Sequence, residues 1–494
     1  MGETMNSRLR IGSIAVLTAL CAVTEASAGA FGLREQSTQA QGLGFAGAAA
    51  GSGGVSSMFW NPAVITMRPG FVTEQNLTYL GPSATITPST GTNPAFGGLG
   101  GSGDIGQGAV LPAGASSYQI NDRLWLGIST GAPFGLTTKP NEVWAGEVYG
   151  RSSRIFSLVF NPVVGFKVNE WLSVAAGPNI EYFRLTLRQA LPLPGLPPTA
   201  YPSSFLKGES WGVGFTAGVN ITPWEGTALG IGYRSSVHHD IDGSIGVPIL
   251  ALAPLAGQVR ANFNTPEKLS VGLTQAVSPI ARVSLGFEWD NWSRLGTVGI
   301  VSKTLGVPVN SLPLNYKDGY YYSIGGEYDV NAALTVRAGF GYETSPIDFS
   351  NRSVRLPDGD RYSLNVGASY RWNNQLTLNA AYSHLFLDRS RILAGIGRDY
   401  NVGNIAFAGC GRFERRHRLG RLPLRLRRPA AAGARPAGPE ELIRFPPSIC
   451  LDGKSQPSRQ IVRDCPPQRP GSRPAGSCSA ASASRTWSTM PAPG

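Results

Sequence analysis

The chain has 494 residues, 42% of them hydrophobic, and a formal net charge of +12. This charge is concentrated in residues 409–494, which carry 15 Arg and one Lys against five acidic side chains, so the rest of the chain is nearly neutral. The composition therefore gives no support for a nucleic-acid-binding body. Every cysteine except Cys21 follows Ala408, which excludes disulfides, zinc–thiolate sites and thiol nucleophiles from residues 29–408.

Residues 1–28 have the pattern of a secretory signal. Arg8 and Arg10 form a basic end, and Ile11–Val23 is an apolar stretch too short to cross a bilayer as a helix. Small residues follow at Ala26–Ala28. The pattern predicts export, with a mature chain that begins at Gly29.

The next segment, residues 29–70, is rich in Gly, Ala and Ser and ends in the stretch "MFWNPAVITMRPG". Pro62 fixes φ and removes a backbone donor, and Asn61 is suited to local hydrogen bonds, so a rigid turn is expected there. Gly42–Gly47 has the spacing G-x-G-x-x-G. No strand precedes it and no βαβ unit surrounds it, so a dinucleotide site is not expected.

After residue 70 the sequence alternates between apolar and polar or glycine residues. The clearest examples are residues 281–292, 334–343 and 362–372. Since successive strand residues point to opposite faces, each segment predicts a strand with one apolar face and one polar or glycine face. These strands have ten or more residues and carry aromatics near their ends, which favours a membrane barrel over a soluble sandwich.

The connections between these strands alternate in length, which is typical of outer-membrane barrels. Short turns are expected near residues 121–122, 169–170, 223–226, 278–280, 329–331 and 373–374. Longer loops are expected at 81–107, 138–151, 190–207, 243–265, 297–315, 346–359 and 389–400. The predicted fold class is thus an all-β, antiparallel transmembrane barrel.

Thirteen strands are recognisable. They are expected near residues 71–80, 108–120, 123–137, 152–168, 171–188, 208–222, 227–242, 266–277, 281–296, 316–329, 332–345, 360–372 and 375–388. Bacterial barrels close with an even number of strands, because an open edge in lipid leaves backbone groups unpaired. A fourteenth strand should therefore follow Arg398.

The sequence from Gly409 onward does not supply such a strand. It lacks alternation and is too rich in arginine to face lipid. Permitted codons for residues 409–427, read one nucleotide later, can encode an alternating strand that ends in Phe. We therefore hypothesise that a frameshift near Gly409 replaced the closing strand; the alternative is a genuine basic, disordered extension over 409–494.

Residues 30–408 resemble the outer-membrane transporters of long-chain fatty acids and hydrocarbons, the FadL/TodX type. The resemblance rests on blocks in the expected order, including "FWNPAV", "APFGLTT", "EWDNWS", "YKDGYYYSIGGEY" and "LPDGDRYSLNVGASY". It implies a fourteen-strand barrel over 71–408 with residues 29–70 as a plug in its lumen. It also implies that Asn61, Pro62 and Ala63 anchor the plug.

The resemblance further implies a side opening in the barrel wall. In the family the third strand carries an inward kink, and the matching residues here are Pro133, Phe134 and Gly135. Proline cannot donate to the strand ladder and glycine lets a strand bend, which suits a kink. The alternative is that the strand simply ends there, before its loop.

The resemblance predicts a substrate head-group site less firmly. Arg184, Arg188 and Lys317 are the basic candidates, although Gln189 and Leu312 occupy the positions that match the family's own basic residues. This difference leaves room for a neutral aromatic or alkane substrate. The alternative is that these residues are charges at the extracellular rim.

The sequence supports an enzyme less well than a transporter. His238 and His239 are adjacent on a strand and face opposite ways, so they are poorly placed to share a metal ion. His384 with Ser383 has the same difficulty as a lipase pair. We expect no enzyme activity, cofactor, metal or nucleic-acid partner. We expect instead a monomeric outer-membrane channel for hydrophobic small molecules, with fatty acids favoured, aromatic hydrocarbons as the alternative and a general porin as a weaker one.

Overall fold

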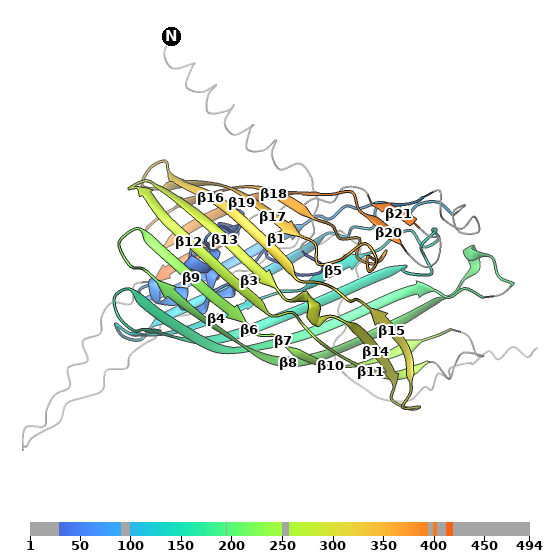
Figure 1. Cartoon of the computed structure of the whole chain (residues 1–494). Coiled ribbons are helices and arrows are strands. Elements are labelled where there is room, and N and C mark those ends of the chain that lie inside the picture. The colour runs from blue at the N-terminus through green and yellow to red at the C-terminus, as the bar shows by residue number, and fades with distance from the viewer. Residues whose placement is uncertain are drawn as a thin grey trace, which may run out of the picture. The chain divides into compact units, whose positions relative to one another are not determined.

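The computed structural model describes residues 29–89, 99–193, 195–248, 256–393, 399–402 and 412–417 (Figure 1). The predicted signal and all of the tail except residues 412–417 lie outside these ranges. All described residues belong to one compact unit, residues 1–422.

Helices are few and short. The segment before the first strand holds one α-helical turn, α2 (Thr38–Gln41), and three 3₁₀ helices, η1 (Ala48–Ala50), η2 (Gly54–Phe59) and η3 (Pro62–Met67). Two further 3₁₀ turns, η4 (Pro198–Ala200) and η6 (Trp292–Arg294), lie in loops. Among the described residues no helix has the length and apolar character needed to cross a bilayer.

Strands make up most of the rest. The first half contains β1 (Phe71–Leu80), β2 (Ile86–Pro88), β3 (Ala109–Gln119), β4 (Leu124–Gly131), β5 (Gly135–Thr138), β6 (Ser152–Lys167), β7 (Leu172–Ala190), β8 (Ser203–Ile221), β9 (Thr227–Arg234) and β10 (His238–Gly246). The second half contains β11 (Gly257–Asn264), β12 (Lys268–Ser278), β13 (Ala281–Asp290), β14 (Thr297–Ser302), β15 (Pro308–Pro313), β16 (Gly319–Asp329), β17 (Leu334–Thr344), β18 (Arg361–Arg371), β19 (Leu376–Leu387), β20 (Arg391–Leu393), β21 (Asp399–Val402) and β22 (Arg412–His417).

The antiparallel pairings run in a circuit. Within the described part of the chain it passes through fourteen strands, β1, β3, β4, β6, β7, β8, β9, β12, β13, β16, β17, β18, β19 and β22, and returns to β1. β22 completes it by pairing with β1 over Phe71–Asn76 and with β19 over Leu376–Asn379. The expectation that the tail supplies no strand is therefore wrong at Arg412–His417.

Several expected loops also contain strands. β11 lies in the predicted loop 243–265, and β14 and β15 lie in the predicted loop 297–315. β10, β11 and β14 pair in succession, so they extend the wall beyond β9, β12 and β13. The loops 81–107 and 389–400 contribute β2, β20 and β21 to a separate three-stranded sheet.

The strands alternate as the sequence pattern predicts. On β8, Trp211, Val213 and Phe215 face outward with exposed fractions of 69%, 68% and 53%, whereas Thr216 and Asn220 are buried on the inner face. A wall whose outer face is apolar is stable only where that face meets lipid. The inner face packs against residues 29–70, hereafter the plug, most of which are buried.

Candidate functional site: the plug and a window in the barrel wall

The plug is anchored at Asn61, the residue before η3. Its side-chain Oδ1 accepts a hydrogen bond from the Ala63 amide at 3.0 Å, and its Nδ2 donates to the carbonyls of Ala49 (2.7 Å) and Val219 (2.9 Å). The side chain is fully buried. One residue therefore caps η3, joins two turns of the plug and ties the plug to β8 of the wall.

Glycines on the inner face let the plug approach the wall backbone. A Cβ on Gly232 of β9 would lie 1.8 Å from the Trp60 carbonyl oxygen, and a Cβ on Gly218 of β8 would lie 2.0 Å from Asn61 Oδ1. Both are far inside van der Waals contact. The polar or glycine face of these strands is thus the surface on which the plug sits.

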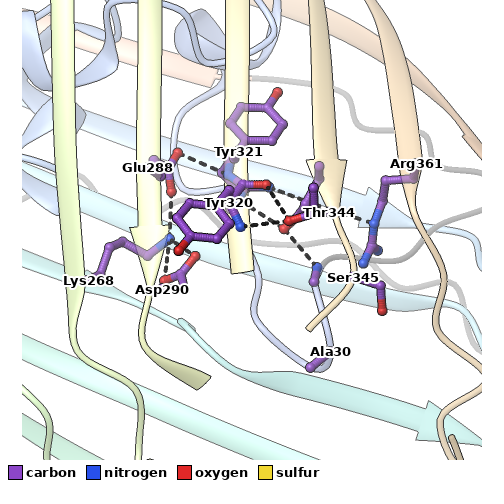
Figure 2. Close-up of polar contacts among 12 residues, drawn as sticks. Ala30, Lys268, Glu288, Asp290, Tyr320, Tyr321, Thr344, Ser345 and Arg361 are labelled. Carbon is purple, nitrogen blue, oxygen red and sulfur yellow. Dashed lines mark hydrogen bonds and ion pairs between the residues drawn. The ribbon is translucent and has the colours of Figure 1, made fainter. Parts of the chain in front are cut away.

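A buried charge cluster holds the first residues of the plug. Arg34 donates to Glu288 of β13 at 3.0 Å and to both oxygens of Glu343 of β17, and its guanidinium lies 3.8 Å from the Tyr321 ring centroid. Lys268 of β12 pairs with the same Glu288. Figure 2 shows part of this network around Glu288, Tyr321 and Lys268.

The cluster continues into the loop before β18. Asp358 accepts hydrogen bonds from the Ala30 amide (3.1 Å), Ser345 Oγ (2.7 Å) and Arg361 Nη2 (2.7 Å). Burial raises the pKa of Asp358, and the Arg361 charge opposes that shift. The first residues of the plug are therefore held by carboxylates from both the wall and a loop.

The kink lies where the sequence predicts a break. β4 ends at Gly131 and β5 begins at Gly135, with Pro133 and Phe134 between them. The plug fills part of the broken ladder, since the Leu33 amide donates to the Pro133 carbonyl at 2.7 Å and the Gly135 amide donates to the Phe31 carbonyl at 2.9 Å. Plug and kink are therefore joined through their backbones.

The kink leaves a window in the wall. β3 pairs with β4 only through Gly114–Gln119, and β5 pairs with β6. Among the described residues, Ala109–Ala113 of β3 therefore have no partner strand on the side of β5. The window is bounded at one end by the pair Gly114–Thr130 and at the other by a bridge between Gly106 and Thr138.

A cavity of about 640 Å³ opens into this window. Its inner lining is mainly apolar and comes from the plug, β1, β3, the kink, β5 and β6, with Leu33, Leu80, Leu111, Phe134, Leu136 and Ile155 as examples. Its lining also includes Val110 and Leu158, whose exposed fractions on the outer face are 57% and 41%. The cavity therefore reaches from the plug to the outside of the wall.

The predicted head-group residues do not line this cavity. Arg184 and Arg188 share the outward face of β7, while Phe183, the residue before Arg184, is buried in the interior. The expectation that they face the lumen is thus not supported, because the inward–outward alternation of β7 runs unbroken through Pro178. Lys317 lies in a loop, half exposed, and pairs with Asp348 at 2.7 Å.

The two adjacent histidines face opposite ways, as the sequence predicts, whereas one charge cluster was not predicted. His239 is fully buried and His238 is exposed, on opposite faces of β10. Arg34, Glu288, Glu343 and Arg361 were not singled out as a group. The only sequence signal of Glu288, Glu343 and Arg361 is a charge at a strand position of inward parity, which does not show that their strands meet Arg34 of the plug.

A plugged β-barrel with an apolar outer face and a window in its wall defines an outer-membrane channel protein. The family described as outer membrane protein transport protein (OMPP1/FadL/TodX) matches residues 19–402, and this chain belongs to it. It therefore resides in the outer membrane of a Gram-negative bacterium, in a family of transporters and channels and not of enzymes.

Similar proteins include both fatty-acid and hydrocarbon transporters. The long-chain fatty acid transport protein of Salmonella typhi is 27% identical over 402 residues, covering 76% of this chain and 91% of the relative. The 47 kDa outer membrane protein of Pasteurella multocida is 28% identical over 390 residues, covering 73% and 88%.

Many solved structures share the fold, of which two are given as examples. That of a Pseudomonas aeruginosa FadL homologue has a TM-score of 0.68 at 23% identity, covering 78% of this chain and 98% of that one. That of the Ralstonia pickettii toluene transporter TbuX has a TM-score of 0.56 at 20% identity, covering 77% and 98%.

Proposed function

We propose that this protein takes up long-chain fatty acids by passive diffusion, and that they leave the barrel sideways through the window. The observation that carries the proposal is the apolar cavity that joins the plug to the outer face of the wall between β3 and β5. Its volume of about 640 Å³ lies in the range of small-molecule sites. The names of the fatty-acid transport relatives support the same substrate class.

Burial of the acyl chain would supply most of the binding free energy. Each buried CH₂ contributes about 0.8 kcal/mol, so a long chain needs few polar contacts. The plug gates the route in this proposal, because Phe31 and Leu33 bond to the kink and Leu33 lines the cavity. Withdrawal of these residues would clear the inner end of the window. No energy source is required.

An aromatic hydrocarbon is the second candidate substrate. It is favoured by the outward position of Arg184 and Arg188, which removes two of the three predicted partners for a carboxylate. The fold is also shared with a toluene transporter.

The test is uptake of labelled oleate and labelled toluene in cells that lack their own transporter and express this chain. The diagnostic variant is Leu136→Trp, which fills the window; Val164→Trp, on the exposed outer face of β6, adds the same ring outside it. We expect oleate uptake to fall with Leu136→Trp and to be retained with Val164→Trp. Uptake of toluene alone would select the second substrate, and equal uptake by both variants would refute exit through the window.

A further inference from the structure

Besides the transport route, the wall carries a groove on its outward face over β6, β7, β8, β10 and β11, which lie side by side in Figure 1. Its volume is about 530 Å³. Arg154, Arg184 and Lys207 line it together with the polar side chains of Thr186, Ser244 and Gln258. We call these six residues the basic groove.

The strand register arranges the basic groove in cross-strand rows. One row consists of Phe156, Arg184, Glu209 and Asp242. The next row consists of Arg154, Thr186, Lys207, Ser244 and Gln258. The row on the other side of Arg184 is apolar and aromatic, with Leu158, Tyr182 and Trp211. Trp211 is 69% exposed and begins the outward apolar run of β8.

This order locates the basic groove relative to the membrane. The turns that join β6 to β7 and β8 to β9 are short, whereas longer loops lie at the other ends of these strands, which is the extracellular side in such barrels. Aromatic side chains mark the edge of the hydrocarbon region. The basic groove lies one row beyond that edge, at the depth of the head groups of the outer leaflet.

The acidic neighbours are already engaged. Glu209 accepts a hydrogen bond from Tyr182 at 2.6 Å, and Asp242 pairs with Lys303 at 2.6 Å. Arg154, Arg184 and Lys207 are exposed, and within the described ranges no carboxylate forms an ion pair with any of them. Arg188 and Arg260 add further exposed cations on the same face.

We propose that the basic groove binds the phosphorylated head group of an outer-leaflet lipid, whose acyl chains lie along the apolar surface beside Trp211. Three outward cations held on paired strands, next to hydroxyl and amide groups, match a phosphate-bearing sugar head group. This role differs from transport, since Arg184, Thr186 and Lys207 line the groove and not the exit cavity, and only Arg154 of the basic groove borders both.

The test measures the affinity of the purified full-length chain, in detergent, for diphosphoryl lipid A and for the same lipid with both phosphates removed. The variant Arg184→Gln/Lys207→Gln removes two cations from the basic groove. The control Arg123→Gln/Arg371→Gln removes two exposed cations near the short turns. A heat-dependent shift in gel mobility confirms that each protein is folded.

We expect the unaltered chain to bind diphosphoryl lipid A at least about tenfold more tightly than the dephosphorylated lipid. The groove variant should lose about tenfold in affinity and the control no more than about twofold. Equal binding of the two lipids by the unaltered chain would overturn the proposal without reference to any variant. Equal losses in the groove and control variants would overturn it as well.

Discussion

At the scale of single residues, Asn61 is the side chain on which the seating of the plug most depends. Replacing it by Ala removes three hydrogen bonds and leaves the Ala49 carbonyl without that donor in a buried place. The cost of unsatisfied buried groups is about 1–3 kcal/mol each. We expect Asn61→Ala to loosen the plug and to raise ion conductance in planar bilayers.

The matched control is Asn121→Ala. Asn121 makes the same kind of local bonds, to the amides of Arg123 and Leu124, but in an exposed turn far from the plug. The Asn121→Ala variant should leave ion conductance unchanged. If both variants conduct alike, the anchoring role assigned to Asn61 is wrong.

Glu35 provides a prediction on pH. Burial raises the pKa of this plug carboxyl from 4.5 to about 7. Between those values the folded protein holds a proton that the unfolded chain has released, so stability falls as pH rises from 4.5 to about 7. Glu35→Gln removes that fall. The variant should unfold at a higher temperature than the unaltered chain at pH 8, and the gap should narrow at pH 4; a gap that is the same at both would contradict the burial argument.

At the scale of elements, contact between plug and wall depends on inner-face glycine. Gly232→Val would place its Cβ 1.8 Å from the Trp60 carbonyl oxygen, so the plug or β9 must move. We expect lower thermal stability and greater protease sensitivity of residues 29–70. The control is Gly326→Val on β16, where a Cβ meets nothing within 4 Å. Equal sensitivity in the two variants would show that the plug is not pressed against β9.

The sequence predicted the strands well where alternation is regular, and the structure confirms a strand at each of the thirteen expected positions. It missed β11, β14 and β15 because these lie beyond the membrane, where no lipid imposes an apolar outer face. The segment 227–242 was read as one strand, but it breaks between Arg234 and His238. Period-two patterning continues through such a break and does not reveal it.

For individual residues, the sequence is informative where the signal is local and uninformative where it depends on the folded barrel. Asn61 and Pro133 were identified because proline and asparagine constrain the backbone locally. Arg184 and Arg188 were named as head-group candidates, but the strand register continues through Pro178 without a shift and leaves both on the outward face. The charge cluster at Arg34 could not be predicted, since its members meet only when β13, β17 and the plug are brought together.

For the whole molecule, closure depends on β22. A chain that ends at residue 408 loses β22 and leaves one edge of Phe71–Asn76 and one edge of Leu376–Asn379 unpaired, at several kcal/mol for each unsatisfied group in lipid. A chain that ends at residue 420 keeps it. We expect the shorter chain to insert poorly and the longer one to match the full chain, as measured by heat-modifiable gel mobility. Equal insertion would show that residues 412–417 are dispensable; restoring the reading frame at Gly409 tests whether a longer strand closes the barrel better.

The glycine face also bears on how such a chain can change over generations. Positions such as Gly218 and Gly232 admit no side chain while the plug is in place, whereas their outward neighbours need only remain apolar. Substitutions should therefore accumulate on alternate residues of each strand. This explains how sequence identity can fall to 23% while the fold is retained, as in the Pseudomonas aeruginosa FadL homologue.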